Sequence, residues 1–383
     1  MTDLWPGTLE ELNKRFIIKE MIDLGPYDIN PLLFNQIFSK YKDYHFKSND
    51  RIVITHIDTQ YYSPASVISM TLYNLHAALS YYKIPTEFIL VFTNHYGIER
   101  ELNFLSSYFN FSSPINAVTS FYDTIGTFNT IKDVDINIEK INFPYVSLNG
   151  QQRTHRLLLL AMLAENDLLS KGMVSYNFMT ASDTHDLGAP SQQINSPIQY
   201  HMLSNPTRIN EHQILDSKSR TIFEKHVSTF IKKKYVHPNI NGSPNDENTR
   251  WQPMFLQDAL VYLVSETVSD YPYPFLTEKT FKGFMTKRPM IITGARHSLQ
   301  MLRNLGFKTW GDWWDESYDS MEHFYQRVAH ITNIIKEISL LSVTDQRRIC
   351  LEMQEVLEYN FQHYVARFCK TDYEYFLKKI RDL

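Results

Sequence analysis

A short run of the sequence, from Pro274 to Lys282, combines a helix start with one acidic and one basic side chain. Thr277 is a good N-cap residue for the helix that follows, which places Glu278 and Lys279 in its first turn. Such a helix start offers free backbone N–H groups and a positive dipole end to phosphate. Lys279 would add a full charge, and Glu278 could accept hydrogen bonds from ribose hydroxyls. The run therefore indicates a nucleotide diphosphate site, whereas an ordinary surface helix with a Glu278–Lys282 ion pair is the alternative.

A second predicted helix start carries an unusual concentration of positive charge. Asn149 follows a predicted strand, and Arg153, His155 and Arg156 come where a helix opens. Because the helix dipole disfavours cations at this end, a bound anion would remove the penalty. Arginine also grips phosphate with a bidentate fork. The pattern indicates an anion site that includes Asn149, Arg153 and Arg156. The alternatives are an exposed basic turn, or arginines that pair with the acidic region of Asp183 and Asp186.

Carboxylates and a histidine at other strand ends are weaker candidates. Glu266 follows a predicted strand and could bind sugar hydroxyls, or it could satisfy the backbone of a turn. His56 and Asp58 lie at the end of the first predicted strand, where a general base could sit. We therefore take Asp58 and His56 as candidate catalytic residues, although any polar residue can end a strand.

Metal and cofactor motifs are missing from the sequence. The two cysteines form no CxxC pair, and no P-loop, HExxH or GxSxG motif is present. Asp133-Val134-Asp135 has the DxD pattern of a metal site, but its surroundings predict a linker between domains. We expect no metal site and no cofactor.

Composition narrows the class of protein. The chain has 383 residues, which suits two domains, with 38 basic and 42 acidic residues and a net charge of −4. A protein that holds nucleic acid mainly by its phosphates usually carries a basic excess, which this chain lacks overall. The lone thiols, the absence of a signal peptide and the absence of a long apolar run predict a soluble, cytoplasmic protein with no membrane span.

The elements that must position these residues alternate between strand and helix, which predicts α/β domains with parallel sheets. Residues 1 to 48 look helical and irregular, and Gly172 stands where a C-cap glycine would end the helix after Arg153. We expect domains at 1–140 and 141–320, with a long insertion at 180–253 and helices at 321–383. The predicted strands are Arg51–Ile57, Glu87–Thr93, Ile115–Phe121, Phe143–Leu148, Met173–Met179, Leu260–Ser265 and Pro289–Thr293.

Several of these runs resemble a group of glycosyltransferase-like proteins that is common in tailed phages. The resemblance covers roughly residues 143 to 320. The residues that carry it are Phe275–Lys282, Lys287-Arg288-Pro289, Leu302–Thr309, Trp314–Asp319 and the run from Asn149 to Arg156. The Thr-Glu-Lys core is also similar to the donor motif of α1,3-fucosyltransferases. This chain has Gly283-Phe284-Met285-Thr286 where the family more often has proline and small residues.

The resemblance implies a GT-B-like fold, with two Rossmann-like domains facing across a cleft and C-terminal helices that pack back on them. The first domain would take the acceptor and the second the nucleotide-sugar. It implies that Glu278 contacts the donor ribose, that Lys279 contacts its phosphates, and that Arg153 or Arg156 completes the clamp. Thr277, Glu266 and Asn149 complete the donor-site prediction.

The function that follows is transfer of a sugar from a nucleotide-sugar to a hydroxyl group. A hydroxymethylated pyrimidine in phage DNA is the favoured acceptor, which makes DNA with a modified base a candidate partner, and UDP-glucose is a candidate donor. The protein would then act in the host cytoplasm. Transfer onto a surface glycan or a protein, and nucleotide binding without catalysis, are the alternatives.

Overall fold

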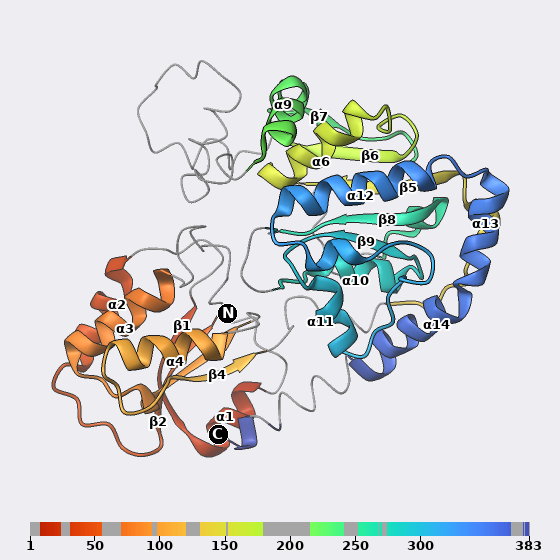
Figure 1. Cartoon of the computed structure of the whole chain (residues 1–383). Coiled ribbons are helices and arrows are strands. Elements are labelled where there is room, and N and C mark those ends of the chain that lie inside the picture. The colour runs from red at the N-terminus through yellow and green to blue at the C-terminus, as the bar shows by residue number, and fades with distance from the viewer. Residues whose placement is uncertain are drawn as a thin grey trace. The chain divides into compact units, whose positions relative to one another are not determined.

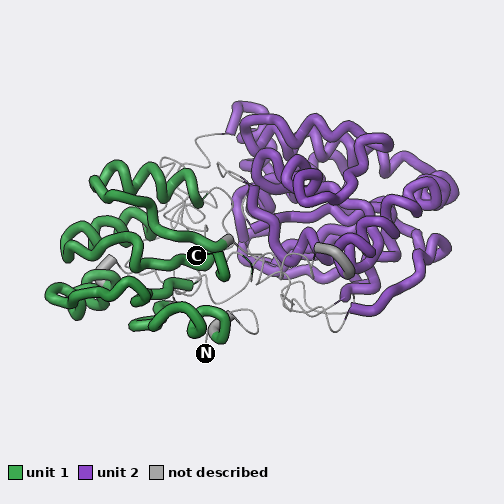
Figure 2. The backbone as a smooth tube through the Cα atoms, turned by 90° about the horizontal axis from the view of Figure 1, so that it is seen from below, with its two compact units in different colours: residues 1–126, 369–383 green, residues 127–368 purple. Residues whose placement is uncertain are grey.

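The computed structural model divides the chain into two compact units, which Figure 2 colours separately. One unit contains residues 1–126 and 369–383, and the other contains residues 127–368. The residues that the structure describes are 8–23, 31–55, 70–93, 98–119, 131–150, 152–178, 215–240, 252–267, 269, 274–368, 378 and 380–382.

The first unit contains a parallel sheet in the order β1-β2-β3-β4 (Figure 1). Its core is formed by aliphatic side chains of β2, β3 and α3, such as Ile52, Val91 and Leu79. The strands are β1 (Ile17–Asp23), β2 (Asp50–Thr55), β3 (Ile89–Thr93) and β4 (Asn116–Thr119), and the helices are α1 (Thr8–Arg15), α2 (Pro31–Phe38), α3 (Met70–Tyr82) and α4 (Ile98–Tyr108).

Strand β1 differs from our expectation of a helical and irregular leading segment. It pairs in parallel with β2 at the edge of the sheet, and most of its residues are partly exposed, including Lys19 and Glu20. An edge strand with charged side chains lacks the continuous apolar run by which the buried strands were found.

The end of the chain returns to the first unit. Arg15 of α1 donates a hydrogen bond to the carbonyl of Ile380 at 3.0 Å, and Arg381 lies 3.6 Å from Glu11. These contacts explain why residues 369–383 group with the first unit rather than with the helices that precede them.

The second unit is built on a sheet in the order β7-β6-β5-β8-β9, in which β7 alone among the described strands is antiparallel. Its strands are β5 (Phe143–Asn149), β6 (Met173–Asn177), β7 (Lys234–Tyr235), β8 (Ala259–Ser265) and β9 (Met290–Thr293). Its helices are α6 (Thr154–Glu165), α9 (Ser217–His226), α10 (Glu278–Met285), α11 (Ser298–Asn304), α12 (Phe324–Ile338), α13 (Val343–Glu352) and α14 (Gln354–Gln362), followed by a π-helical segment at His363–Phe368. Short 3₁₀ turns lie at Ser39–Tyr41, Thr86–Phe88, Ile138–Lys140, Val227–Thr229, Met254–Asp258 and Ser317–Ser320.

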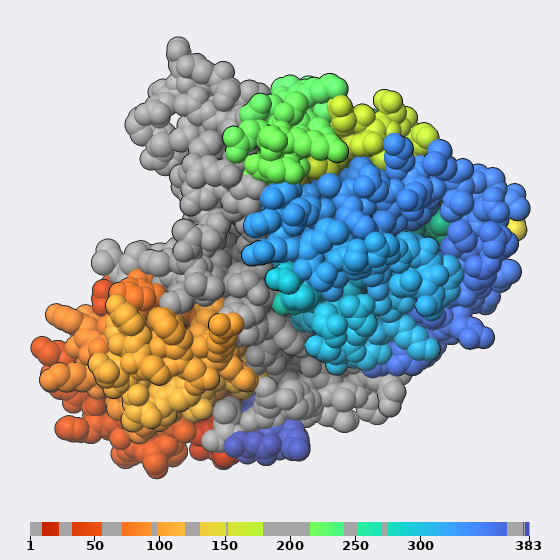
Figure 3. All heavy atoms as spheres, viewed as in Figure 1, coloured from red at the N-terminus to blue at the C-terminus, as the bar shows by residue number. Residues whose placement is uncertain are grey.

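Helix α6 is the central helix of this unit. All residues from Thr154 to Leu163 are buried, because α9 and α12 both pack against α6 (Figure 1). Helix α12 also contacts β5 and β9 of the sheet. Every residue of β8 is buried as well, as expected for a central parallel strand covered on both faces. In the space-filling view, α12 and α11 cover much of the visible face of this unit (Figure 3).

The unit boundary falls before the expected position at residue 140. The segment 131–140 belongs to the second unit, because Asp133 pairs with the buried Lys287 at 2.6 Å and the carbonyls of Asp135 and Asn137 accept from Gln257 and Arg288. Helices α12 to α14 also belong to this unit rather than to a separate segment at 321–383.

The predicted strands of both halves are confirmed to within a few residues where the structure describes them, and both sheets are mainly parallel. The insertion contains α9 and β7, whereas residues 179–214 and 241–251 lie outside the described part. The arrangement of two domains across a cleft stays a prediction. Among the described helices, none has the length and apolarity needed to cross a bilayer.

Candidate functional site

The second sheet has a topological switch point between β5 and β8. The chain leaves β5 through α6 and returns in β6 on one side, whereas β8 pairs with β5 on the other side. In open parallel sheets, ligands bind outside the carboxyl ends of the strands at such a point. Helix α6 begins five residues after β5, and α10 begins after the loop that follows β8. The two helix starts singled out by the sequence therefore belong to the two strands that flank the switch point.

The start of α6 is tied directly to the end of β8. His155 donates from Nε2 to the carbonyl of Glu266 at 2.8 Å. Arg156 donates from Nη2 to the carbonyls of Ser265 and Glu266 at 3.2 and 3.1 Å. Both side chains are buried. They fix the first turn of α6 against β8, and Arg153 stands at the N-cap of that turn.

Glu266 organises the start of α10. Its Oε1 accepts from the Thr277 N–H at 3.0 Å and from the Thr280 hydroxyl at 2.6 Å, and its Oε2 accepts from the Thr277 hydroxyl at 2.6 Å and from the Thr267 N–H at 3.2 Å. An ionised carboxylate has about four acceptor positions, so this buried group is fully engaged. The structure thus gives Glu266 the role of holding the loop in place.

Glu278 and Lys279 form the partly exposed part of the site. Lys279 Nζ lies 2.6 Å from Glu278 Oε1 and donates to the hydroxyls of Thr267 and Thr277 at 3.3 and 3.4 Å. Burial by itself would raise the pKa of Glu278, but Lys279 and Lys282 beside it outweigh burial and lower the pKa. Glu278 is therefore ionised at neutral pH, and the pair sits at the N-terminus of α10, where Thr277 is the N-cap.

A row of buried polar groups lies at the carboxyl ends of three neighbouring strands. Asn149 ends β5, Ser265 ends β8, and Thr293 of β9 pairs in register with Ser265. Asn149 Nδ2 donates to the Ser147 hydroxyl and the Ser175 carbonyl at 3.2 and 3.4 Å. Asn149 Oδ1, Ser265 Oγ and Thr293 Oγ1 are buried without a hydrogen-bond partner among the described residues. Unsatisfied polar atoms are expensive to bury, so this edge has spare capacity to hydrogen-bond a ligand or water.

The structure brings Arg156, Glu266, Thr277, Glu278 and Lys279 into one connected network. Arg153 and Asn149 lie where expected, at the N-cap of α6 and the end of β5. The candidate bases Asp58 and His56 lie outside the described residues. Donor binding by these residues stays a prediction, as does the absence of a metal. In the part of the chain that the structure describes, no three His, Cys, Asp or Glu side chains gather as a metal site would require.

The prediction missed Thr267 and Thr280, which complete the hydrogen bonds to Glu266 and Lys279. Both are inconspicuous in the sequence because threonine is common after strands and in helices. Thr280 follows the N-cap by three residues, a spacing that places it on the same side of the first turn. His155 was part of the basic run but was not singled out as a site residue.

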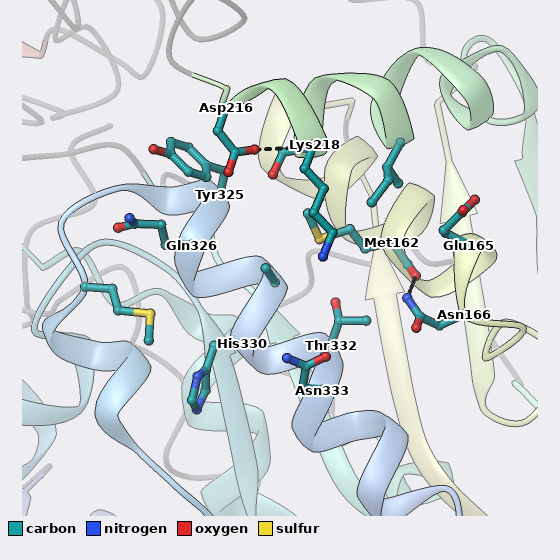
Figure 4. A pocket seen from close by; sticks show the side chains of 14 residues that line it. Met162, Glu165, Asn166, Asp216, Lys218, Tyr325, Gln326, His330, Thr332 and Asn333 are labelled. Carbon is teal, nitrogen blue, oxygen red and sulfur yellow. Dashed lines mark hydrogen bonds between the residues drawn. The ribbon is translucent and has the colours of Figure 1, made fainter.

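A separate cavity of about 620 Å³ lies between α6, α9 and α12 (Figure 4). It contains none of the residues predicted to bind the donor. Glu165 in its lining already accepts from Lys225 and His226, and His330 lies 3.0 Å from Asp315. The remaining lining charges, Asp216 and Lys218, cancel. The cavity therefore lacks the cationic excess that a diphosphate needs, and the carboxyl edge of the sheet is the better candidate. Its other lining residues are Met162, Asn166, Ser219, Ile222, Met321, Tyr325, Gln326, Ala329, Thr332 and Asn333.

Comparison with known proteins adds a similarity of structure. No protein-family model matches the chain, and no curated protein sequence matches it. One similar solved structure is that of a DNA-modifying enzyme, a β-glucosyltransferase whose substrate is uridine diphosphoglucose. The alignment covers 96% of this chain and 100% of that chain, with 10% sequence identity and a TM-score of 0.39. This similarity is too low to assign a residue or an activity.

Proposed function

We propose that the chain is a glycosyltransferase whose nucleotide-sugar donor binds at the carboxyl edge of the second sheet. The observation that carries the proposal is the network that joins two helix starts at the switch point between β5 and β8. Arg156 and Glu266 hold the two starts together, while Lys279 and Glu278 stay partly exposed beside them. The resemblance of the Thr-Glu-Lys run to a donor motif agrees with this placement.

The network divides into groups that would touch the donor and groups that position them. Lys279 and the N-terminus of α10 would bind one phosphate, and Arg153 at the N-cap of α6 would bind the other. Glu278 would accept hydrogen bonds from the ribose. Arg156 and Glu266 are buried and bonded within the protein, so we assign them the positioning of the two helix starts.

This arrangement suits displacement at the anomeric carbon of the sugar. The bond from that carbon to the donor phosphate breaks as the acceptor hydroxyl attacks, and negative charge develops on the departing diphosphate. Preorganised cations and helix N-termini stabilise charge at that place. A general base takes the proton of the acceptor hydroxyl. Asp58 and His56 remain our candidates for the base.

For the acceptor, we propose a hydroxymethylated pyrimidine in DNA, on the strength of the sequence resemblance to phage proteins. To test this, the protein is incubated with UDP-glucose and hydroxymethylated duplex DNA, the DNA is digested to nucleosides, and the masses of the nucleosides are measured by mass spectrometry. A hexose added to the modified nucleoside is the expected result. Transfer to a saccharide or protein, but not to DNA, would move the acceptor to a surface glycan or a protein.

Donor hydrolysis separates an enzyme from a binding protein. Many transferases slowly hydrolyse their donor without an acceptor, so release of free sugar is expected from the wild type and not from Lys279→Ala. Lys336→Ala, which removes an exposed lysine from α12, is the matched control and should hydrolyse donor at the wild-type rate. Donor binding without hydrolysis or transfer to any acceptor would leave a nucleotide-binding protein without catalysis.

A further inference from the structure

One segment of the second unit is basic although the whole chain is acidic. Residues 215–240 contain six lysines and arginines against two carboxylates, Asp216 and Glu224, while the chain carries a net charge of −4. The basic residues are Lys218, Arg220, Lys225, Lys232, Lys233 and Lys234, and all of them are exposed. A cluster of positive side chains produces a positive surface potential even on a protein whose net charge is negative, and such a surface attracts polyanions.

The topology places the end of this segment at the same sheet edge as the candidate donor site. Lys234 pairs with Asn177, the last residue of β6, and the Phe178 N–H donates to the Lys233 carbonyl at 2.9 Å. In β5, Asn149 pairs with Tyr176. Since β7, β6 and β5 are neighbours and strands lie about 4.8 Å apart, the two lysines sit on the order of 10 Å from the end of β5.

Two lysines without an ion-pair partner among the described residues lie beside an exposed aromatic ring at the start of β7. Lys233 and Lys234 form no ion pair with any described residue, in contrast to Lys225, which Glu165 neutralises at 2.6 Å. Tyr235 next to them is 47% exposed. Its ring lies against Tyr176 at 6.0 Å between centroids, which supports it from one side. Unpaired cations beside an exposed aromatic ring are the groups that nucleic-acid surfaces use.

We propose that Lys233, Lys234 and Tyr235, which we call the β7 edge, hold the phosphate backbone of the DNA acceptor beside the donor site. The naming of the acceptor rests on the proposed function, but the binding of DNA does not. Duplex DNA carries about one negative charge per 1.7 Å of its axis, so a short edge meets several phosphates. An acidic peptide offers a lower charge density.

The experiment measures binding of the full chain to a short fluorescent DNA duplex by anisotropy, without donor, from about 50 to about 200 mM salt. Each lysine–phosphate contact contributes about 0.9 to the slope of log affinity against log salt. We expect Lys233→Gln with Lys234→Gln to reduce this slope by about 2 and to weaken binding at least roughly tenfold at low salt.

A matched double variant controls for net charge. Lys140 and Lys171 are exposed and precede β5 and β6, so they lie at the opposite, amino edge of the same sheet. Lys140→Gln with Lys171→Gln makes the same change in charge and should leave the slope at its wild-type value. Equal loss in both double variants would overturn the β7 edge as the site, because overall charge would then account for binding.

The other outcomes are equally decisive. Absence of DNA binding by the wild type, or displacement of DNA by polyglutamate as effective as by unlabelled DNA, would overturn the proposal. Lysines also protect edge strands from pairing with other chains, and unchanged DNA affinity in the β7-edge variant would leave them that role alone. If DNA binds through the β7 edge but no sugar is transferred, the surface stands and the proposed transfer fails. If transfer proceeds with an unchanged KM for DNA in that variant, the surface is wrong and the transfer stands.

Discussion

Replacing Glu266 by glutamine tests whether a buried carboxylate holds the start of α10 in place. Glutamine keeps the shape but turns one of the two oxygens into an NH₂ group. Each oxygen of Glu266 accepts from one backbone N–H and one threonine hydroxyl. A hydroxyl can rotate and accept instead, but a backbone N–H cannot. Either orientation of glutamine therefore leaves one backbone donor, of Thr277 or Thr267, facing another donor.

The cost follows from that geometry. A buried donor without a partner costs roughly 1–3 kcal/mol, and the remaining bonds lose their charge assistance. We expect the free energy of unfolding of the second unit to fall by about 2–3 kcal/mol. For a unit of this size, 1 kcal/mol shifts the thermal midpoint by roughly 2–4 °C, so the midpoint should fall by roughly 4–12 °C. Donor binding should weaken as well, because Thr277 no longer fixes the first turn of α10.

Differential scanning calorimetry measures the midpoint, and two variants serve as controls. Glu278→Gln makes the same chemical change at a partly exposed carboxylate that pairs with Lys279, where the cost is at most about 1 kcal/mol. It should weaken donor binding with little loss of stability. Glu224→Gln on the exposed surface of α9 should change neither property. A Glu266→Gln protein with the wild-type midpoint and wild-type donor affinity would refute the positioning role of Glu266.

Three further predictions concern pH and packing. Because Lys279 and Lys282 outweigh burial and lower the pKa of Glu278 in the folded state, its contribution to stability is present above the ordinary carboxyl pKa. The difference in unfolding free energy between wild type and Glu278→Gln should stay constant from pH 8 to about 5 and vanish only in stronger acid, as urea titrations can show. Burial lowers the pKa of His76 to about 4 in the folded state. Between pH 6.5 and about 4, His76 is therefore protonated in the unfolded chain but neutral in the folded chain. Stability should fall by about 2 kcal/mol between pH 7 and 5, and His76→Gln should remove that part of the dependence, whereas equal slopes in both proteins would contradict it. A Cβ at Gly172 would overlap the ring of Tyr145, so Gly172→Ala should cost roughly 1–3 kcal/mol in unfolding free energy, and an unchanged calorimetric midpoint would show that the ring moves freely.

The sequence predicted best the elements whose residues are buried on all sides. β8 and β9 are continuous apolar runs, and such runs have few alternatives to a central parallel strand. It failed at β1, an edge strand with charged side chains, and at β7, which has two residues and depends on pairing with β6. Pairing partners are distant in the chain, so local patterns do not reveal them.

The sequence also suggested the wrong reason for the glycine at position 172. We expected Gly172 to be the C-cap glycine of the helix after Arg153, but α6 ends at Glu165, and the residue with a positive φ that follows it is Asp167. Gly172 is required because Tyr145 packs against its backbone. Such a close approach depends on tertiary packing and leaves no local signature.

The position of the candidate site could be predicted from the sequence, but the role of each side chain within the site could not. Helix starts with unusual charges pointed to Arg153, Arg156, Glu278 and Lys279. Whether each side chain faces a ligand or the protein is decided by contacts more than 100 residues apart, such as Arg156 with the Glu266 carbonyl. The threonines that bind Glu266 had no distinguishing pattern for the same reason.

The most direct measurement is a thermal-shift titration of the wild type and Lys279→Ala with nucleotide-sugars, beginning with UDP-glucose, and with Lys336→Ala as control. Binding to the folded state alone stabilises it by about 2.7 kcal/mol at a ligand concentration 100 times Kd. We predict a saturable rise in the midpoint for the wild type and for Lys336→Ala, and no rise for Lys279→Ala. A Lys279→Ala protein that gains the same stability from the same donor as the wild type would contradict a donor site at the start of α10.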